Sequence, residues 1–196
     1  MPAPDLRTLP NAGCYRVVFA DPAWKFRTRS ETSAGILKSP ANHYRCSSIE
    51  EMGALPVAHI TWPDAWLFMW CTWPHLPQAF KLAESWGTPE NPWVYSTGGA
   101  WGKRPRGWRG DPKKWQIGTG YIFRSACEPL LVFRRGKPIW RSKSERNLWI
   151  APVRAHSQKP ENVRDMIRRA TLGPRLEMFS RDVADGFDRW GDQAPG

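Results

Sequence analysis

Residues 15–24, "YRVVFADPAW", combine a strand and a polar turn within ten residues. The first six, "YRVVFA", are mostly β-branched and aromatic, which predicts a buried strand ending at Asp21. The turn that follows brings Asp21, Pro22 and Trp24 to the carboxyl end of this strand. Because ligands of open α/β sheets bind beyond the carboxyl ends of strands, this turn is a candidate site.

Apolar strands and helices alternate along the rest of the chain. A capping box of Ser48 and Glu51 opens one helix, and Gly173 ends another. The periodicity predicts helices at 48–55, 77–86 and 159–173, and further strands at 65–72, 92–97, 128–136, 147–152 and 175–181. This order predicts an α/β domain with a mostly parallel sheet and helices on both faces.

The length of 196 residues suits one domain with a sizeable core, so we expect a single domain over residues 1–196. The longest apolar run, "AWLFMWC", is far shorter than the roughly 20 residues of a membrane span. The first ten residues lack the basic head and apolar core of a signal peptide. We therefore expect a cytoplasmic protein without a membrane partner.

Residues that bind metals and phosphates are not arranged in the usual motifs. The four cysteines are far apart and the four histidines are scattered, so we expect free thiols and no bound metal. The sequence holds neither a Gly-x-Gly-x-x-Gly fingerprint nor a Walker loop. The ordinary dinucleotide and triphosphate sites are therefore not predicted.

Positive charge is concentrated in the middle of the chain. Residues 101–149 hold 13 Lys and Arg against three acids, which is +10 of the formal net charge of +11. Tryptophans and Tyr121 are interleaved with these charges, a pattern that suits nucleic acid, although a solvated basic surface is the alternative. Residues 98–120 show no periodicity and predict a functional or mobile loop. The cations expected to contact phosphates are Lys103, Arg104, Arg106, Arg109, Lys113 and Lys114.

An Asp-Pro pair after a strand is often only a turn, but this one also suits a particular chemistry. The exocyclic amino group of a base is a poor nucleophile because its lone pair is delocalised into the ring. The Asp21 carboxylate and the Pro22 carbonyl could each accept one N–H and make that lone pair more available. Trp24 could stack on the base, which is worth about 1–3 kcal/mol. Together they suit alkylation of an amino group on a flipped-out base.

The same residues carry a resemblance to a known family. "ADPAW" resembles the Asp-Pro-Pro-Trp signature of the adenine-N(6) methyltransferases named for the seventy-kilodalton MT-A subunit, which include shorter bacterial and phage members. Five further stretches resemble the family in the same order and bring the coverage to residues 15–193. They are "NHYRCSSIEEMGALPV", "AWLFMWCTWPHLPQAFKLAESWG", "GTGYIFRSACEPLLVFRRG", "VRAHSQKPENV", and "RLEMFSR" followed by "WGDQ".

The resemblance implies a permuted Rossmann-like fold that uses S-adenosylmethionine, with the catalytic signature ahead of the cofactor-binding strand. It implies that Asp21, Pro22 and Trp24 hold the target adenine, and that Lys159 lies between substrate and cofactor. Further substrate contacts are implied for Tyr44, Glu128 and Ser157. The cofactor contacts that it implies are Asp5, Asp21, Lys159, Glu177, Arg181, Asp192 and Gln193.

Several of these residues have plain structural alternatives. Lys159 could be a solvated residue before a helix, and Tyr44 could pack under helix 48–55. Glu128 could pair with an arginine such as Arg124. Glu177, inside an apolar strand, would be costly to bury alone, so Arg181 or a cofactor group is its expected partner.

Two positions depart from the family pattern, because Ala23 replaces its second proline and Asp192 its usual asparagine. The accepting carbonyl belongs to Pro22, so we still expect an active enzyme. The expected reaction is transfer of a methyl group from S-adenosylmethionine to the 6-amino group of adenine in DNA. Adenine in RNA, the amino group of cytosine and a non-catalytic nucleic-acid-binding partner subunit remain alternatives, and the oligomeric state stays open.

Overall fold

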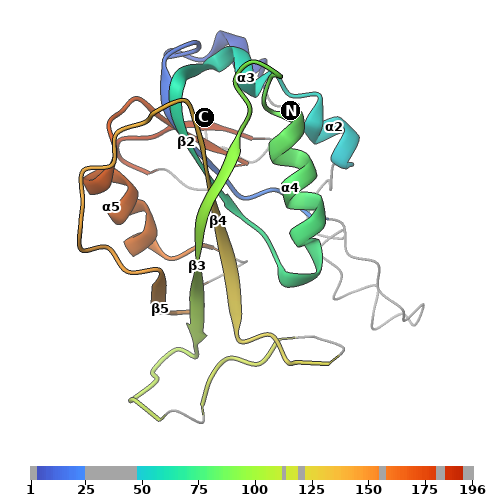
Figure 1. The fold of residues 1–196 in the computed structure, drawn as a ribbon. Coiled ribbons are helices and arrows are strands. Elements are labelled where there is room, and N and C mark those ends of the chain that lie inside the picture. Colours follow the sequence, from blue (N-terminus) through green and yellow to red (C-terminus); the bar gives the residue numbers. More distant parts are fainter. Residues whose placement is uncertain are drawn as a thin grey trace.

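The computed structural model of the chain describes residues 4–24, 48–111, 114–118, 122–154, 158–179 and 184–191. Within these ranges seven strands form one sheet in the order β5-β3-β4-β2-β1-β6-β7 (Figure 1). The strands are β1 (Tyr15–Ala20), β2 (Thr61–Trp70), β3 (Val94–Arg104), β4 (Cys127–Arg135), β5 (Leu148–Pro152), β6 (Arg175–Met178) and β7 (Asp188–Trp190). The α-helices are α2 (Ile49–Gly53), α3 (Val57–Ile60), α4 (Leu76–Ser85) and α5 (Glu161–Ala170).

The sheet is mixed, and together with the helices it confirms the predicted α/β class. Strand β1 pairs in parallel with β2 and with β6, β6 pairs in parallel with β7, and β3 with β5. Strand β4 is antiparallel to both of its neighbours, β2 and β3. The carboxyl ends of β1, β2, β3 and β6 therefore lie at one edge, together with the beginning of β4. This edge is called the carboxyl edge below.

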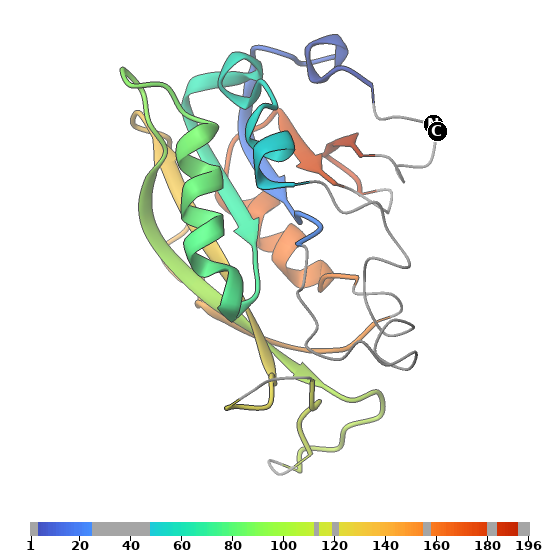
Figure 2. The same cartoon turned by 90° about the vertical axis from the view of Figure 1, so that its right-hand side faces the viewer.

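Two hydrophobic cores lie on opposite faces of the sheet, because successive strand residues point to opposite faces. On one face, Val18 of β1 belongs to the core that includes Leu82 of α4. On the other face, Phe19 belongs to the core that includes Met166 of α5. Figures 1 and 2 accordingly show α4 and α5 on opposite sides of the sheet. Helices cover both faces, as the alternating pattern predicts.

Local sequence signals explain where the helices begin and end. Ser48 and Glu51 form the predicted capping box of α2, in which each side chain accepts a hydrogen bond from the other residue's backbone N–H. Helix α5 begins directly after Pro160. The short helix α3 and the three-residue strand β7 were not predicted. None of the helices in the described residues is long and apolar enough to cross a membrane.

Strand β3 extends further than the sequence predicts, since residues 98–104 were expected to be loop. A side chain on Gly99 would place its Cβ 2.5 Å from the Trp149 ring of β5. A Cβ on Gly98 would lie 3.0 Å from the carbonyl oxygen of Leu130 on β4. The glycines therefore mark positions where neighbouring strands approach closely, and they do not end the strand.

The connection from β3 to β4 projects away from the rest of the molecule. Its described parts, residues 105–111, 114–118 and 122–126, extend beyond the carboxyl edge in both views (Figures 1 and 2). This projecting connection contains the rest of the predicted basic loop.

Replacing Gly99 by alanine should therefore destabilise the fold. The new Cβ would overlap the Trp149 ring and the Asn147 carbonyl, and overpacking of this kind costs about 1–3 kcal/mol. Urea unfolding of Gly99→Ala and the wild type measures the difference. Thr97→Ala, an exposed change in the same strand, is the control and should cost less than about 1 kcal/mol. Equal midpoints for Gly99→Ala and the wild type would contradict the packing described.

Candidate functional site at the carboxyl edge

Four charged side chains of alternating sign meet at the carboxyl edge. The Lys159 Nζ lies 2.8 Å from Asp21 Oδ2 and 3.6 Å from Glu128 Oε2. The other oxygen of Glu128, Oε1, accepts a hydrogen bond of 3.0 Å from Lys103 Nζ. Asp21, Lys159, Glu128 and Lys103 are called the charged cluster below.

Strand alternation explains why these residues meet. Asp21 follows Phe19 by two residues, and Glu128 precedes Leu130 by two; both apolar residues belong to the core on the α5 side. Since side chains two apart share a face of a strand, both carboxylates are directed toward the α5 side. Lys159 enters from the segment just before α5. The cluster therefore depends on two strands and one helix start that are far apart in sequence.

The charged cluster is largely shielded from solvent but not closed. The Lys159 side chain is 8% exposed and that of Glu128 is 11%, whereas that of Asp21 is 25% exposed. Burial alone would raise the pKa of Glu128, but Lys159 and Lys103 together outweigh burial and lower it. Glu128 is therefore ionised at neutral pH. Its Oε2 is buried and accepts no hydrogen bond from the described residues.

The turn after β1 is fixed by backbone hydrogen bonds. The Asp21 N–H donates to the Met178 carbonyl of β6 at 3.3 Å, and the Trp24 N–H donates to the Pro22 carbonyl at 2.9 Å. Trp24 is buried in the core on the α4 side, and its ring stacks on His75 with centroids 5.6 Å apart. Its indole N–H donates to the Trp70 carbonyl at 3.2 Å. Trp24 thus anchors the turn to β2 and to the segment before α4.

The partner of Glu177 is a residue that the sequence analysis did not single out. Glu177 is buried and forms two hydrogen bonds with Arg164 of α5, at 2.6 and 3.0 Å. The expected partner, Arg181, lies outside the described residues. A buried carboxylate in an apolar strand needs a cation, so the arginines of α5 could have been searched for one.

Asp5 lies near the N-terminal end of the described residues and pairs with Arg7, two residues away in sequence. Its carboxylate accepts hydrogen bonds from the side chain and the backbone N–H of Arg7, which lower its pKa to about 2. It thereby caps the short 3₁₀ helix η1 (Leu6–Thr8). The predicted contact between Asp5 and the cofactor stays a prediction.

The predicted phosphate-binding residues fall into two groups. Lys103 and Arg104 lie in β3, and Arg106, Arg109 and Lys114 lie on the projecting connection. Lys103 lies in β3, where it pairs with Glu128 and faces the charged cluster, which differs from the expected position on a loop. Arg104 lies 5.8 Å from the Trp108 ring. Arg106 and Arg109 are exposed on the projecting connection. Lys114 pairs at 3.6 Å with Asp111, and Lys113 lies outside the described residues.

The projecting connection also carries two exposed apolar side chains that the sequence analysis did not single out. Ile122 and Phe123 are 88% and 86% exposed. Both lie close in sequence to the exposed Arg124. Their exposure depends on how the connection leaves the sheet, which no local pattern indicates.

Besides Lys113, five predicted site residues lie outside the described residues. They are Tyr44, Ser157, Arg181, Asp192 and Gln193. Within the described ranges, no group of three or more His, Cys, Asp or Glu is placed to hold a metal ion. Cys14, Cys71 and Cys127 are free.

The mixed sheet with helices on both faces makes this chain an α/β protein, and its charged cluster lies at the edge where open α/β sheets commonly bind ligands. Residues 15–193 match the MT-A70 family, so the chain belongs to this family of methyltransferases, as the resemblance implied. The chain is also 29% identical over 197 residues to the Type II methyltransferase M.MunI of Mycoplasma sp.. That alignment covers 92% of this chain and 78% of the relative. Methyltransferases of the MT-A70 family generally use S-adenosylmethionine.

Removal of the Glu128 charge should destabilise the protein in a pH-dependent way. Glu128→Gln leaves the buried Lys159 with one carboxylate fewer, and breaking a buried ion pair costs about 3 kcal/mol. The folded-state pKa of Glu128 is lowered from 4.5, so its stabilisation is present above that pH and is lost as the pH falls through the lowered value. Urea unfolding at pH 7 and at lower pH measures the difference from the wild type.

Glu145→Gln is the matched control, because the arginine that pairs with Glu145 is largely exposed. It should cost less than about 1 kcal/mol at pH 7. A Glu128→Gln difference that persists unchanged below the lowered pKa would show that another property of the side chain is responsible.

Proposed function

We propose that the protein transfers a methyl group from S-adenosylmethionine to the 6-amino group of adenine in DNA. The observation that carries the proposal is the position of Asp21, which lies at the carboxyl edge within the family's signature and is held by a buried lysine. The similarity to a Type II methyltransferase favours DNA over RNA as the substrate. A DNA-modifying enzyme of this kind would act in the cytoplasm, as a single domain over residues 1–196.

The described residues fit S-adenosylmethionine, which carries a positive sulfur, an amine and two ribose hydroxyls. Asp21 and Glu177 supply carboxylates at the ends of the neighbouring strands β1 and β6. Phe179, directly after β6, has a φ of 62°, an uncommon backbone conformation that is concentrated at ligand sites. Glu177 would contact the cofactor together with Arg181, Asp192 and Gln193. The proposed catalytic turn follows β1, the first strand of the chain, and Glu177 lies in the later strand β6, which is the order that a permuted arrangement of motifs would require.

Asp21 and Pro22 would activate the amino group of the base. The cofactor supplies a methyl group on a positively charged sulfur. Asp21 Oδ2 accepts a hydrogen bond from Lys159, which leaves Oδ1 to accept one N–H of the substrate. The Pro22 carbonyl accepts from the Trp24 N–H with one lone pair, and its second lone pair would accept the other N–H. Both contacts increase the availability of the nitrogen lone pair, and the released proton passes to Asp21 or to solvent.

The other members of the charged cluster would orient Asp21. Lys159 lies between Asp21 and Glu128, so its ammonium restrains the carboxylate that contacts the base. Glu128 in turn lies between Lys159 and Lys103. Trp24 is buried in the core on the α4 side, where His75 lies against one face of its ring, and it would hold the base through the other face. Tyr44 and Ser157 are proposed to complete the base site.

The projecting connection would bind the DNA backbone. Arg106 and Arg109 are exposed on the projecting connection, and Arg104 is the last residue of β3, where the connection begins. Contacts to phosphates give affinity and salt dependence but no sequence readout. In this arrangement Lys103 would not contact phosphates, because it pairs with Glu128 in the charged cluster.

Asp21→Asn should abolish methyl transfer and retain cofactor binding. The substitution removes a negative charge that accepts an N–H in the transition state, so the rate should fall at least about a hundredfold. Radiolabelled S-adenosylmethionine with separate DNA and RNA pools measures the transfer, and digestion of the product identifies the methylated base. Label in RNA, on cytosine, or in no pool would favour one of the three alternatives over adenine in DNA.

Asp185→Asn is the control, because this exposed aspartate lies in the segment before β7 and only its backbone carbonyl accepts a described hydrogen bond. It should methylate at the wild-type rate. Normal turnover by Asp21→Asn would reject the role of Asp21.

The double variant Arg106→Gln/Arg109→Gln should bind duplex DNA more weakly and with a shallower dependence on salt. Each lost phosphate contact reduces the slope of log K against log salt by about 0.9. Fluorescence anisotropy with a labelled duplex at several salt concentrations measures both values. Arg134→Gln/Lys137→Gln, at the opposite edge of the sheet, is the control. Equal slopes for the two double variants would show that the projecting connection does not contact phosphates.

A further inference from the structure

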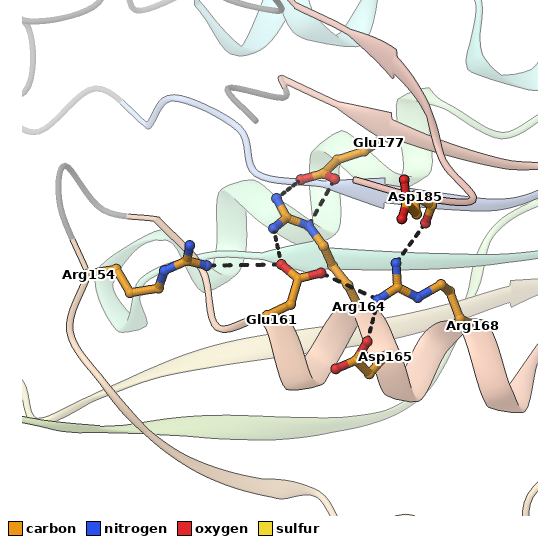
Figure 3. A network of polar contacts seen from close by, with 7 residues as sticks. All are labelled: Arg154, Glu161, Arg164, Asp165, Arg168, Glu177 and Asp185. Atoms are coloured by element: carbon orange, nitrogen blue, oxygen red, sulfur yellow. Dashed lines mark hydrogen bonds and ion pairs between the residues drawn. The ribbon is translucent and has the colours of Figure 1, made fainter. Parts of the chain in front are cut away.

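A buried arginine–glutamate pair joins α5 to β6 (Figure 3). The Arg164 Nη2 lies 2.6 Å from Glu177 Oε1, and its Nε lies 3.0 Å from Oε2. Both residues are about 5% exposed. The fork of the guanidinium therefore contacts both oxygens of the carboxylate, which fixes the plane of Glu177 as well as its charge.

The remaining side of the guanidinium is also held. Arg164 Nη1 donates to Glu161 Oε2 at 2.8 Å, on the first turn of α5. Glu161 is itself paired with Arg168 at 3.5 Å and with Arg154 at 4.0 Å (Figure 3). All three nitrogens of Arg164 thus have partners. A lysine could not reproduce this arrangement, because its ammonium is a single point charge without a planar fork.

The pair connects two segments that belong to the proposed site. Helix α5 begins two residues after Lys159, which holds Asp21. Glu177 lies one residue before the end of β6, beside the strand that leads to Asp21. Arg164 therefore ties the position of Lys159 to that of Glu177.

Stability alone does not account for such a pair. An apolar pair of similar volume is often as stable as a buried ion pair, or more so. A carboxylate has about four lone-pair sites, and Arg164 occupies one on each oxygen. The remaining sites of Glu177 are therefore held in a fixed direction for another donor.

We propose that Arg164 is a positioning residue of the cofactor site, which orients the Glu177 carboxylate to accept hydrogen bonds from a hydroxyl or amine of S-adenosylmethionine. This inference rests on the proposed function, because it takes Glu177 as a cofactor contact. Arg164 itself would act through Glu177 and would contact neither S-adenosylmethionine nor the target base.

The charges around Glu177 predict how the site responds to pH. The facing groups are Arg164 and Glu161 on α5, Asp21 after β1, and Arg189 in register on β7. Burial raises the pKa of Glu177, Arg164 opposes this, and the nearby Asp21 adds to it. Without Arg164 the pKa would rise further. Cofactor binding that needs the ionised carboxylate would then weaken as the pH falls and recover as it rises.

The test compares Arg164→Met and Arg164→Lys with the wild type by isothermal titration with S-adenosylmethionine over a range of pH. Loss of hydrogen bonds to a buried charged group should raise the Kd of Arg164→Met about ten- to a hundredfold, and more at low pH than at high pH. Arg164→Lys keeps the charge and should lie between Arg164→Met and the wild type. In kinetics, KM for S-adenosylmethionine should rise while kcat at saturation and the Kd for DNA change little.

Two further variants separate positioning from folding. Arg168→Met, one turn along α5, removes contacts to Asp165, Glu161 and the Asp185 carbonyl but none to Arg164 or Glu177, so its Kd should match the wild type. Arg164→Met in a Glu177→Gln background should add little to the loss caused by Glu177→Gln alone, because Arg164 acts through Glu177. If Arg164→Met does not fold, as judged by circular dichroism, Arg164→Lys decides the question.

The outcomes distinguish the inference from the proposed function. A wild-type protein that binds no S-adenosylmethionine overturns the proposed function. A wild-type protein that binds it, together with an Arg164→Lys variant of the same Kd and pH profile, overturns only the role of Arg164.

Discussion

The position of the Lys159 ammonium between two carboxylates is the constraint on which the carboxyl edge depends. Asp21 and Glu128 are like charges brought together by neighbouring parts of one sheet, and their repulsion would be costly without a cation between them. The residues come from the end of β1, the start of β4 and the segment before α5. Their pairing therefore requires β1 and β4 to lie on the two sides of β2, and α5 to cover the same face.

Much of the fold could be predicted because its signals are local. The apolar run of β1, the capping box of α2 and the periodicity of α5 each lie within a few residues, and the structure confirms these elements. The second half of β3 could not be predicted, because its glycines resemble a loop until Trp149 and Leu130 are placed beside them. The close approach that explains these glycines is a contact between distant segments, which no local window contains.

The candidate site shows the same division. Asp21, Glu128 and Lys159 could be singled out from motifs, and the structure brings them together. The face of the sheet on which Lys103 lies could not be predicted, because it depends on where β3 ends. Once the strand reaches Arg104, alternation places Lys103 on the face of Trp101 and next to Glu128. The role of Arg164 depended on which helix residue faces Glu177, and this is set by the packing of α5 on the sheet.

Asp21 and Glu177 differ in how completely they are paired, and this difference suits two kinds of binding. The Asp21 side chain is 25% exposed and Lys159 contacts one of its oxygens, so a substrate N–H could reach the other. The Glu177 side chain is 7% exposed and both of its oxygens are held by a rigid fork. An acceptor that must gain and lose a hydrogen-bond partner in each reaction cycle needs access and a spare oxygen. An acceptor that only holds a bound molecule in place gains more from a fixed direction, because less ordering remains to be done when the molecule binds.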